Sequence, residues 1–124
     1  MSMLESGEMY LETILILSQK HSYVRSVDIS EYMSFSKPSV SRAIRNLKNE
    51  GCIDIDPKGA ITLTSSGKAR AEDIYGRHQL FTKILQAIGV SEETASRDAC
   101  RIEHYISSET VEAVKRYAAA HGLK

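Results

Sequence analysis

The chain has 124 residues, and its 16 basic residues are balanced by 16 acidic ones, which gives a formal net charge of zero at pH 7. This length can bury a core without disulfide staples, and the two cysteines, Cys52 and Cys100, form no CxxC pair. No signal peptide and no membrane-spanning apolar run is evident, so we expect a cytoplasmic protein with reduced thiols and no membrane partner. A neutral total argues only weakly against nucleic-acid binding, because the local distribution of charge decides contact with phosphate.

Two helices are predicted in the first 33 residues. Residues 5–20 place apolar side chains at helical spacing, and the sequence "KHS" ends the run. Ser26 is then a suitable N-cap for a shorter helix over residues 27–33, "VDISEYM". A turn of three residues follows.

The third predicted helix, "KPSVSRAIRNLKNEG", combines an apolar stripe with a basic face. Ser36 is its expected N-cap, Pro38 is tolerated in the first turn, and Gly51 ends the helix. Apolar residues recur at i, i+3, i+4 and i+7 from Val40 onward, and the opposite face is polar. Before Glu50 the helix has no acidic residue to offset its basic ones, which are Lys37, Arg42, Arg45 and Lys48.

After Gly51 the apolar period changes to two, which predicts a β-hairpin. "CIDID" and "AITLT" alternate around the turn "PKG". The order helix, short helix, turn, helix and hairpin is that of a winged helix-turn-helix, whose third helix enters the major groove of DNA. Alternatively, the basic face is only a solvated surface, and Lys58 in the turn is polar only for solubility. The predicted DNA-contacting residues are Arg25, Ser36, Lys37, Pro38, Ser39, Ser41, Arg42, Arg45, Lys48 and Lys58.

The second half reads as three helices. A long helical pattern, with Gly67 and Gly76 inside it, ends at Gly89, and Ser91 caps "EETASRDACRIEHYI" before a last helix, "SSETVEAVKRYAAAHG". We therefore expect a mainly α fold with a winged helix-turn-helix domain over residues 1–74 and an all-helical domain over residues 75–124. Apolar helices attached to one DNA-binding unit favour a homodimer, which suits a palindromic operator.

The stretch "ACRIEH" carries the chemistry of a metal site. Cys100, Glu103 and His104 stand at i, i+3 and i+4, so on a helix their side chains leave one face, and all three are donors for divalent transition metals. One helix rarely completes a site, and the candidates for further ligands are His78 and the i, i+3 pair formed by Met9 and Glu12. Taken singly, each of these residues has a purely structural reading, as does Cys52.

The sequence resembles the diphtheria-toxin-repressor and manganese-transport-regulator family of metal-dependent transcriptional repressors. Across almost the whole chain, the matching stretches are "EMYLETI", "VRSVDIS", "SFSKPSVSRAIRNLKNEG", "ITLTSSGKARA", "RHQLF", "IGVSEE" and "DACRIEHYIS". The resemblance implies a dimeric repressor of metal-uptake genes that binds double-stranded DNA when loaded with metal. It also implies that one metal site joins the two domains through Met9, Glu12, His78, Cys100, Glu103 and His104.

Within this resemblance, sulfur ligands decide the expected metal. Manganese-selective members have aspartate at the position of Met9 and glutamate at that of Cys100, whereas iron-responsive members have methionine and cysteine. Soft ligands suit Fe(II), so Fe(II) is the expected ion, with Mn(II) as the alternative and Co(II), Ni(II) or Zn(II) as mimics in vitro. Glu12, however, is the residue of the manganese type, so the site is a hybrid in which two bound ions are conceivable.

Four departures from the family pattern limit what can be carried over. Ser96 and Thr82 stand where the iron type has the histidine and glutamate of an ancillary site, which argues against that site. His78 is then either part of a binuclear arrangement with Glu12 and Glu103 or a support outside the coordination shell. Arg42 replaces a glutamine of some relatives, which leaves the operator open, and an end at Lys124 implies that the SH3-like domain is absent.

The sequence also bears on two other function classes. An enzyme is disfavoured because the sequence has no glycine-rich phosphate loop and no second acid–base constellation, so no small-molecule substrate is expected. The main alternative is a winged-helix regulator that does not sense metal, either constitutive or redox-responsive, with Cys100 structural or redox-active.

Overall fold

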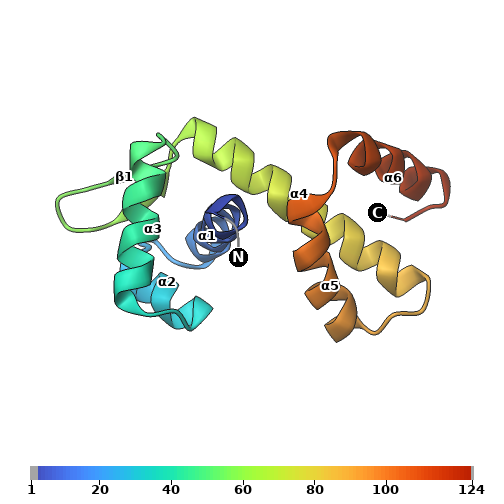
Figure 1. The fold of residues 1–124 in the computed structure, drawn as a ribbon, viewed down its shortest axis with the longest axis horizontal. Coiled ribbons are helices and arrows are strands. Elements are labelled where there is room, and N and C mark those ends of the chain that lie inside the picture. The colour runs from blue at the N-terminus through green and yellow to red at the C-terminus, as the bar shows by residue number, and fades with distance from the viewer. Residues whose placement is uncertain (1–2, 124) are drawn as a thin grey trace. The chain divides into compact units, whose positions relative to one another are not determined.

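The structure, a computed structural model, describes residues 3–123 and divides into two compact units, Met1–Glu72 and Asp73–Lys124 (Figure 1). The described residues form six helices and one two-stranded sheet, which confirms the predicted mainly helical fold class. Within this described part, no helix is long and apolar enough to cross a membrane.

The first two helices pack on each other through the apolar residues that the sequence pattern indicates. In α1 (Met3–Lys20), Leu11 and Ile14 are fully buried, and α2 (Ser26–Met33) contacts α1 and buries Ile29. The predicted cap of α2 is wrong by one residue: Ser26 is already helical and Arg25 is the N-cap. The reason is that the backbone N–H of Arg25 donates to the Asp28 carboxylate at 2.9 Å, which extends the helix start by one position.

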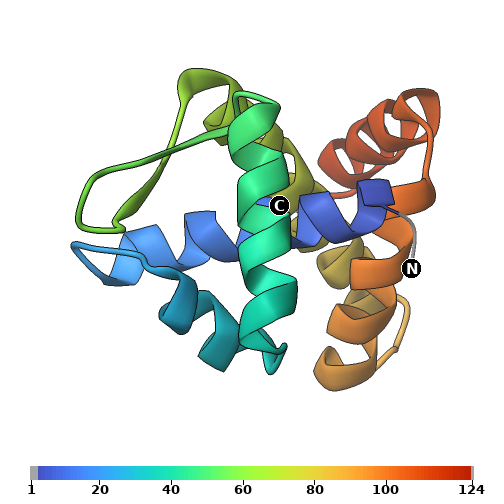
Figure 2. The same ribbon diagram turned by 60° about the vertical axis from the view of Figure 1, so that its left-hand side comes forward.

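Helix α3 (Lys37–Asn49) follows the predicted pattern at both ends. The Ser36 hydroxyl accepts the backbone N–H of Ser39 at 3.3 Å, so Ser36 is the N-cap, and a proline lies in the first turn. Val40, Ile44 and Leu47 form the buried stripe. The chain leaves the helix through Gly51, whose φ of +78° lies in the left-handed region that favours glycine. Figure 2 shows α3 in full view, with the hairpin extending beyond it.

The predicted hairpin is present as β1 (Ile53–Ile55) and β2 (Ile61–Leu63), paired antiparallel with Ile55 opposite Ile61. Its tip is organised by one side chain, because a single carboxylate oxygen of Asp56 accepts the backbone N–H groups of Lys58 at 2.9 Å and Ala60 at 2.8 Å. Gly59 adopts a φ of +88° there. Lys58 is exposed at this tip, which extends away from the helices of the first unit (Figures 1 and 2).

The hairpin is tied to the start of α4 (Ser65–Ala87) by Thr64 and Gly67. The Thr64 hydroxyl donates to the Gly51 carbonyl at 2.7 Å and accepts the Gly67 N–H at 3.1 Å. Gly67 packs against the backbone of Cys52, where no side chain fits. Cys52 itself is buried, and its sulfur accepts a hydrogen bond from Arg70 at 3.2 Å, which fits the structural reading.

The second unit contains the C-terminal part of α4 together with α5 (Glu92–Tyr105) and α6 (Ser108–Ala120). Its core joins one residue from each helix, Phe81, Ala99 and Val111. The N-caps of α5 and α6 are Ser91 and Ser107, whose hydroxyls each accept a backbone N–H three residues later. These caps fix where α5 starts, and therefore which of its residues share a face.

Candidate metal centre and nucleic-acid interface

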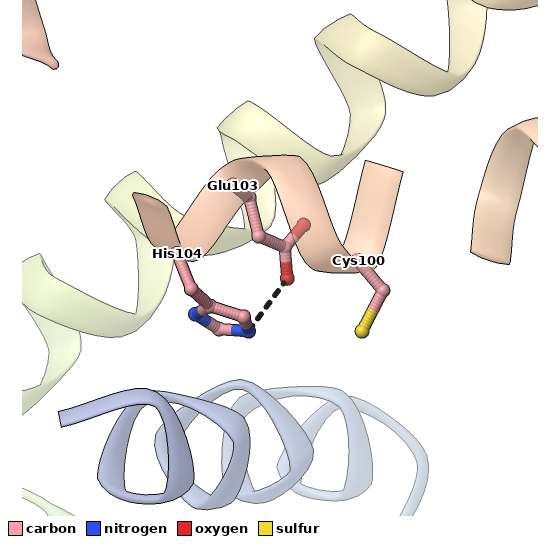
Figure 3. Close-up of side chains that lie close together, drawn as sticks. All are labelled: Cys100, Glu103 and His104. Atoms are coloured by element: carbon pink, nitrogen blue, oxygen red, sulfur yellow. Dashed lines mark ion pairs between the residues drawn. The ribbon is translucent and has the colours of Figure 1, made fainter. Parts of the chain in front are cut away.

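Cys100, Glu103 and His104 lie together on one side of α5, as their spacing predicts (Figure 3). One potential ligand atom from each residue lies within 4.8 Å of the other two. Glu103 is fully buried, His104 is buried and Cys100 is half-buried. The group therefore offers one sulfur, one nitrogen and at least one oxygen donor at a single point.

The buried carboxylate of Glu103 is the electrostatic centre of this group. Its Oε2 lies 3.0 Å from Nδ1 of His78, and its Oε1 lies 3.4 Å from Nε2 of His104, the pair joined by the dashed line in Figure 3. Oε1 accepts no hydrogen bond from any residue that the structure describes. Burying a carboxylate is costly unless a cation or hydrogen-bond donors compensate it, so this oxygen fits a site for a positive ion.

The donor set also fits a divalent transition metal. Thiolate sulfur, imidazole nitrogen and carboxylate oxygen are all ligands of such ions, and the sulfur favours the softer ones. Three donors from a single helix leave positions in the coordination shell for ligands from elsewhere in the chain.

His78 lies on α4 and uses both ring nitrogens within the second unit. Nδ1 faces Glu103, and Nε2 lies 3.3 Å from the hydroxyl of Ser96 on α5. Thr82, one turn along α4, donates its hydroxyl to the His78 carbonyl at 2.7 Å. Ser96 and Thr82, which replace the ancillary-site ligands of the iron type, thus both contact His78. They do so with hydroxyls, which are weaker metal ligands than imidazole and carboxylate.

Arg77 is a residue of this region that the sequence reasoning missed. Its guanidinium lies 3.4 Å from the carbonyl oxygens of both Glu103 and Ile106 and 3.3 Å from the carboxylate of Asp73. A cation at the last carbonyls of a helix satisfies them and complements the helix dipole, so Arg77 fixes the end of α5 that carries Glu103. The i, i+4 spacing from Asp73 was the only local signal.

Met9 and Glu12, the two other predicted ligands, lie one turn apart on α1 in the first unit, and both are half-buried. Their part in a metal site stays a prediction.

Most of the predicted DNA-contacting residues are exposed on the first unit. Ser39 is half-buried, and exposed are Arg25, Ser36, Lys37, Pro38, Ser41, Arg42, Arg45, Lys48 and Lys58. Over the described residues, no ion pair engages the four basic side chains of α3. These cations are therefore available to an external anion, and the N-terminus of α3 adds the positive end of its dipole.

A pocket of about 500 Å³ opens beside the N-terminal half of α3. It is lined by Tyr10 of α1, by the turn before α3 and by Arg42 and Asn46 of α3. Burial raises the pKa of the Tyr10 phenol above its usual value, and the charge of Arg42 partly offsets this effect. The phenol is therefore a neutral hydrogen-bond donor at physiological pH.

Comparisons with known proteins find one family match for each half of the chain. Residues 2–61 match the family "Iron dependent repressor, N-terminal DNA binding domain", and residues 64–120 match "Iron dependent repressor, metal binding and dimerisation domain". The transcriptional regulator MntR of Escherichia coli O6:H1 is 34% identical over 115 residues, which cover 93% of this chain and 74% of MntR.

Two solved structures show the same fold. The manganese regulator SloR aligns with a TM-score of 0.82 and 27% identity, over 91% of this chain and 53% of SloR. A manganese-dependent transcriptional repressor in complex with manganese aligns with a TM-score of 0.83 and 26% identity, over 95% of this chain and 53% of its own. The chain thus spans about half the length of these two structures.

Proposed function

The chain belongs to the iron-dependent repressor family of metal-dependent transcriptional regulators, and from this premise we propose that it represses transcription when Fe(II) binds beside α5. The observation that carries the proposal is the group formed by Cys100, Glu103 and His104, with a fully buried carboxylate at its centre. When bound, the ion supplies positive charge and fixed coordination geometry.

We propose that Met9 and Glu12 of α1 complete the ligand set, with His78 holding the Glu103 carboxylate in place through its Nδ1 contact. Ligands from both α1 and α5 would couple metal binding to the arrangement of the DNA-binding unit. The free energy of such coupling is typically 1–3 kcal/mol, so we expect DNA affinity to rise roughly 5- to 150-fold on metal binding.

The preference for Fe(II) rests on the two sulfur atoms, Sγ of Cys100 and the thioether of Met9. The similar structures that are described as manganese regulators favour Mn(II), which is the alternative ion for this chain. Replacing Cys100 by glutamate exchanges the thiolate for a carboxylate, so we expect this variant to shift the ratio of Mn(II) to Fe(II) affinity towards manganese.

We propose that α3 and the hairpin bind DNA. The basic face of α3, Arg25 and Lys58 would contact a double-stranded operator, and two copies of the chain would bind a palindrome as a homodimer. We further propose that the protein acts in the cytoplasm and has no enzymatic activity.

The test is an anaerobic titration. The metal-free protein is titrated with Fe(II) and, separately, with Mn(II), and its affinity is measured for duplexes selected from a random-sequence library by the metal-loaded protein. We expect Fe(II) to bind more tightly, Cys100→Ala to abolish the metal effect, and the selected duplexes to show two-fold symmetry.

Cys52→Ala is the matched control, because it removes the other thiol, which lies in the core of the first unit. It should keep the metal response in protein that remains folded. DNA binding that is equal with and without metal would refute the proposal and leave a winged-helix regulator that does not sense metal. Tighter binding of Mn(II) in both assays would refute only the choice of ion.

A further inference from the structure

The pocket beside α3 contains a polar group for which the fold supplies no partner. The Tyr10 side chain lines this pocket and is only 2% exposed. Its ring packs against Phe35 at a centroid distance of 6.1 Å, and among the described residues no group hydrogen-bonds its hydroxyl. The hydroxyl oxygen is not among the buried atoms that lack a partner, so it is open to the pocket, where it can donate a hydrogen bond to a ligand.

The other polar groups of the pocket define what that ligand is. Arg42 contributes an exposed guanidinium with no ion pair among the described side chains, and Ser36 and Ser39 contribute hydroxyls at the N-terminus of α3. Among the described residues that line the pocket, none is acidic. A permanent cation, hydroxyl donors and the positive end of a helix together suit an anion with several oxygen atoms.

We propose that this pocket binds a phosphate group of the DNA backbone, with the Tyr10 hydroxyl and the Arg42 guanidinium as its two main donors. The inference rests on the proposed DNA binding and adds a contact from α1, a helix that sequence reasoning assigned only to metal binding and the core. DNA is the favoured source of the phosphate because the pocket lies along α3, the helix proposed to enter the major groove.

This contact gives α1 two roles. Tyr10 follows the proposed metal ligand Met9 directly in sequence and precedes Glu12 by two residues. The same turn of helix would therefore contact both the metal and the DNA. A change in the position of α1 would then alter the phosphate contact without any change in α3.

The experiment compares Tyr10→Phe with wild type in the full metal-loaded chain. This variant removes one hydroxyl and keeps the ring that packs on Phe35, and thermal unfolding verifies that it is folded. Affinity is measured by fluorescence anisotropy on a selected duplex and on a scrambled duplex, over a range of salt concentrations. Tyr23→Phe is the matched control, because Tyr23 is 64% exposed in the same unit and does not line the pocket.

We expect Tyr10→Phe to weaken binding about tenfold on both duplexes, because a phosphate contact carries no sequence information. Its salt dependence should stay that of wild type, since no charge is lost. Arg42→Gln should also weaken both duplexes and reduce the slope of log affinity against log salt by about one. In a series of duplexes, one phosphate at a time is replaced by a neutral methylphosphonate. At one position, this replacement should weaken DNA binding by wild type and leave DNA binding by Tyr10→Phe unchanged.

Three results would overturn the inference while leaving metal-dependent DNA binding intact. These are wild-type affinity of Tyr10→Phe, weakening confined to the selected duplex, or no methylphosphonate position that is coupled to Tyr10. Inorganic phosphate provides a further arm, read by NMR shifts of Tyr10 and Ser39. Phosphate that shifts these signals and competes with DNA supports the inference, whereas phosphate that shifts them without competing assigns the pocket to a free anion and overturns it.

Discussion

Gly67 offers the sharpest test of the packing that holds the hairpin against α4. A Cβ atom at this position would lie 1.9 Å from the carbonyl oxygen of Cys52, 2.7 Å from its carbonyl carbon and 3.0 Å from its Cα. All three are backbone atoms, so no change of rotamer relieves the overlap. Gly67→Ala must therefore move the start of α4 away from Cys52.

The cost follows from the size of that movement. Reaching ordinary van der Waals separation requires a shift of more than about 1 Å, and overpacking of this kind typically costs 1–3 kcal/mol. The shift also strains the 3.0 Å hydrogen bond from the Thr64 N–H to the Cys52 carbonyl, which contributes about 1 kcal/mol. Replacing glycine by alanine in a helix returns about 1 kcal/mol, so the net loss is about 1–3 kcal/mol.

Gly76 provides the matched control, because it lies in the same helix and has nothing within 4 Å of an added Cβ. Gly76→Ala should stabilise the protein by up to about 1 kcal/mol. Urea unfolding of both variants and wild type, followed by circular dichroism, measures the two free-energy changes. The packing argument would be refuted if both substitutions changed the free energy of unfolding in the same direction, or if Gly67→Ala were as stable as wild type.

Three further predictions concern the second unit. Glu103→Gln keeps the shape of the side chain but removes its charge, so Co(II) affinity measured by calorimetry should fall more than about tenfold; an unchanged affinity would exclude this carboxylate as a ligand. Ser96→His places an imidazole beside His78, and the variant should retain more Zn(II) per chain after dialysis than wild type, whereas equal retention would show that the added imidazole creates no second metal position. Phe81→Ala should lower stability by about 3–5 kcal/mol in thermal unfolding, and a loss below about 1 kcal/mol would show that Phe81 is not central to the core.

Features that depend on a single helix were predictable from sequence. The start of α3 at Ser36 and the shared face of Cys100, Glu103 and His104 follow from capping and the helical period alone. Val40, Ile44 and Leu47 of the predicted apolar stripe of α3 are buried as well, whereas Ala43 is only half-buried. Such features are local, because residues close in sequence fix one another's direction once the helix forms.

Features that depend on contacts between elements were not predictable in the same way. The role of Arg77 at the carbonyls of α5 depends on tertiary packing that no sequence spacing reports. Tyr10 reads as one more apolar position of α1, and only the folded structure shows that it lines a pocket. The N-cap of α2 is an exception of another kind, because it depends on a contact within three residues, from the Arg25 N–H to the Asp28 carboxylate, that the sequence prediction still missed.

The carboxylate of Asp56 lowers the entropic cost of a contact made by the hairpin tip. By accepting two backbone N–H groups, it fixes the tip in one conformation within the isolated chain. Ordering the backbone costs about 1–2 kcal/mol per residue, and a mobile tip would incur this cost each time DNA is bound. Because folding has already ordered the backbone of the tip, a contact through Lys58 requires only the ordering of one side chain. The tip that we propose to contact the DNA backbone is thus ordered before DNA binds, so the entropic cost of ordering its backbone would not reduce the affinity.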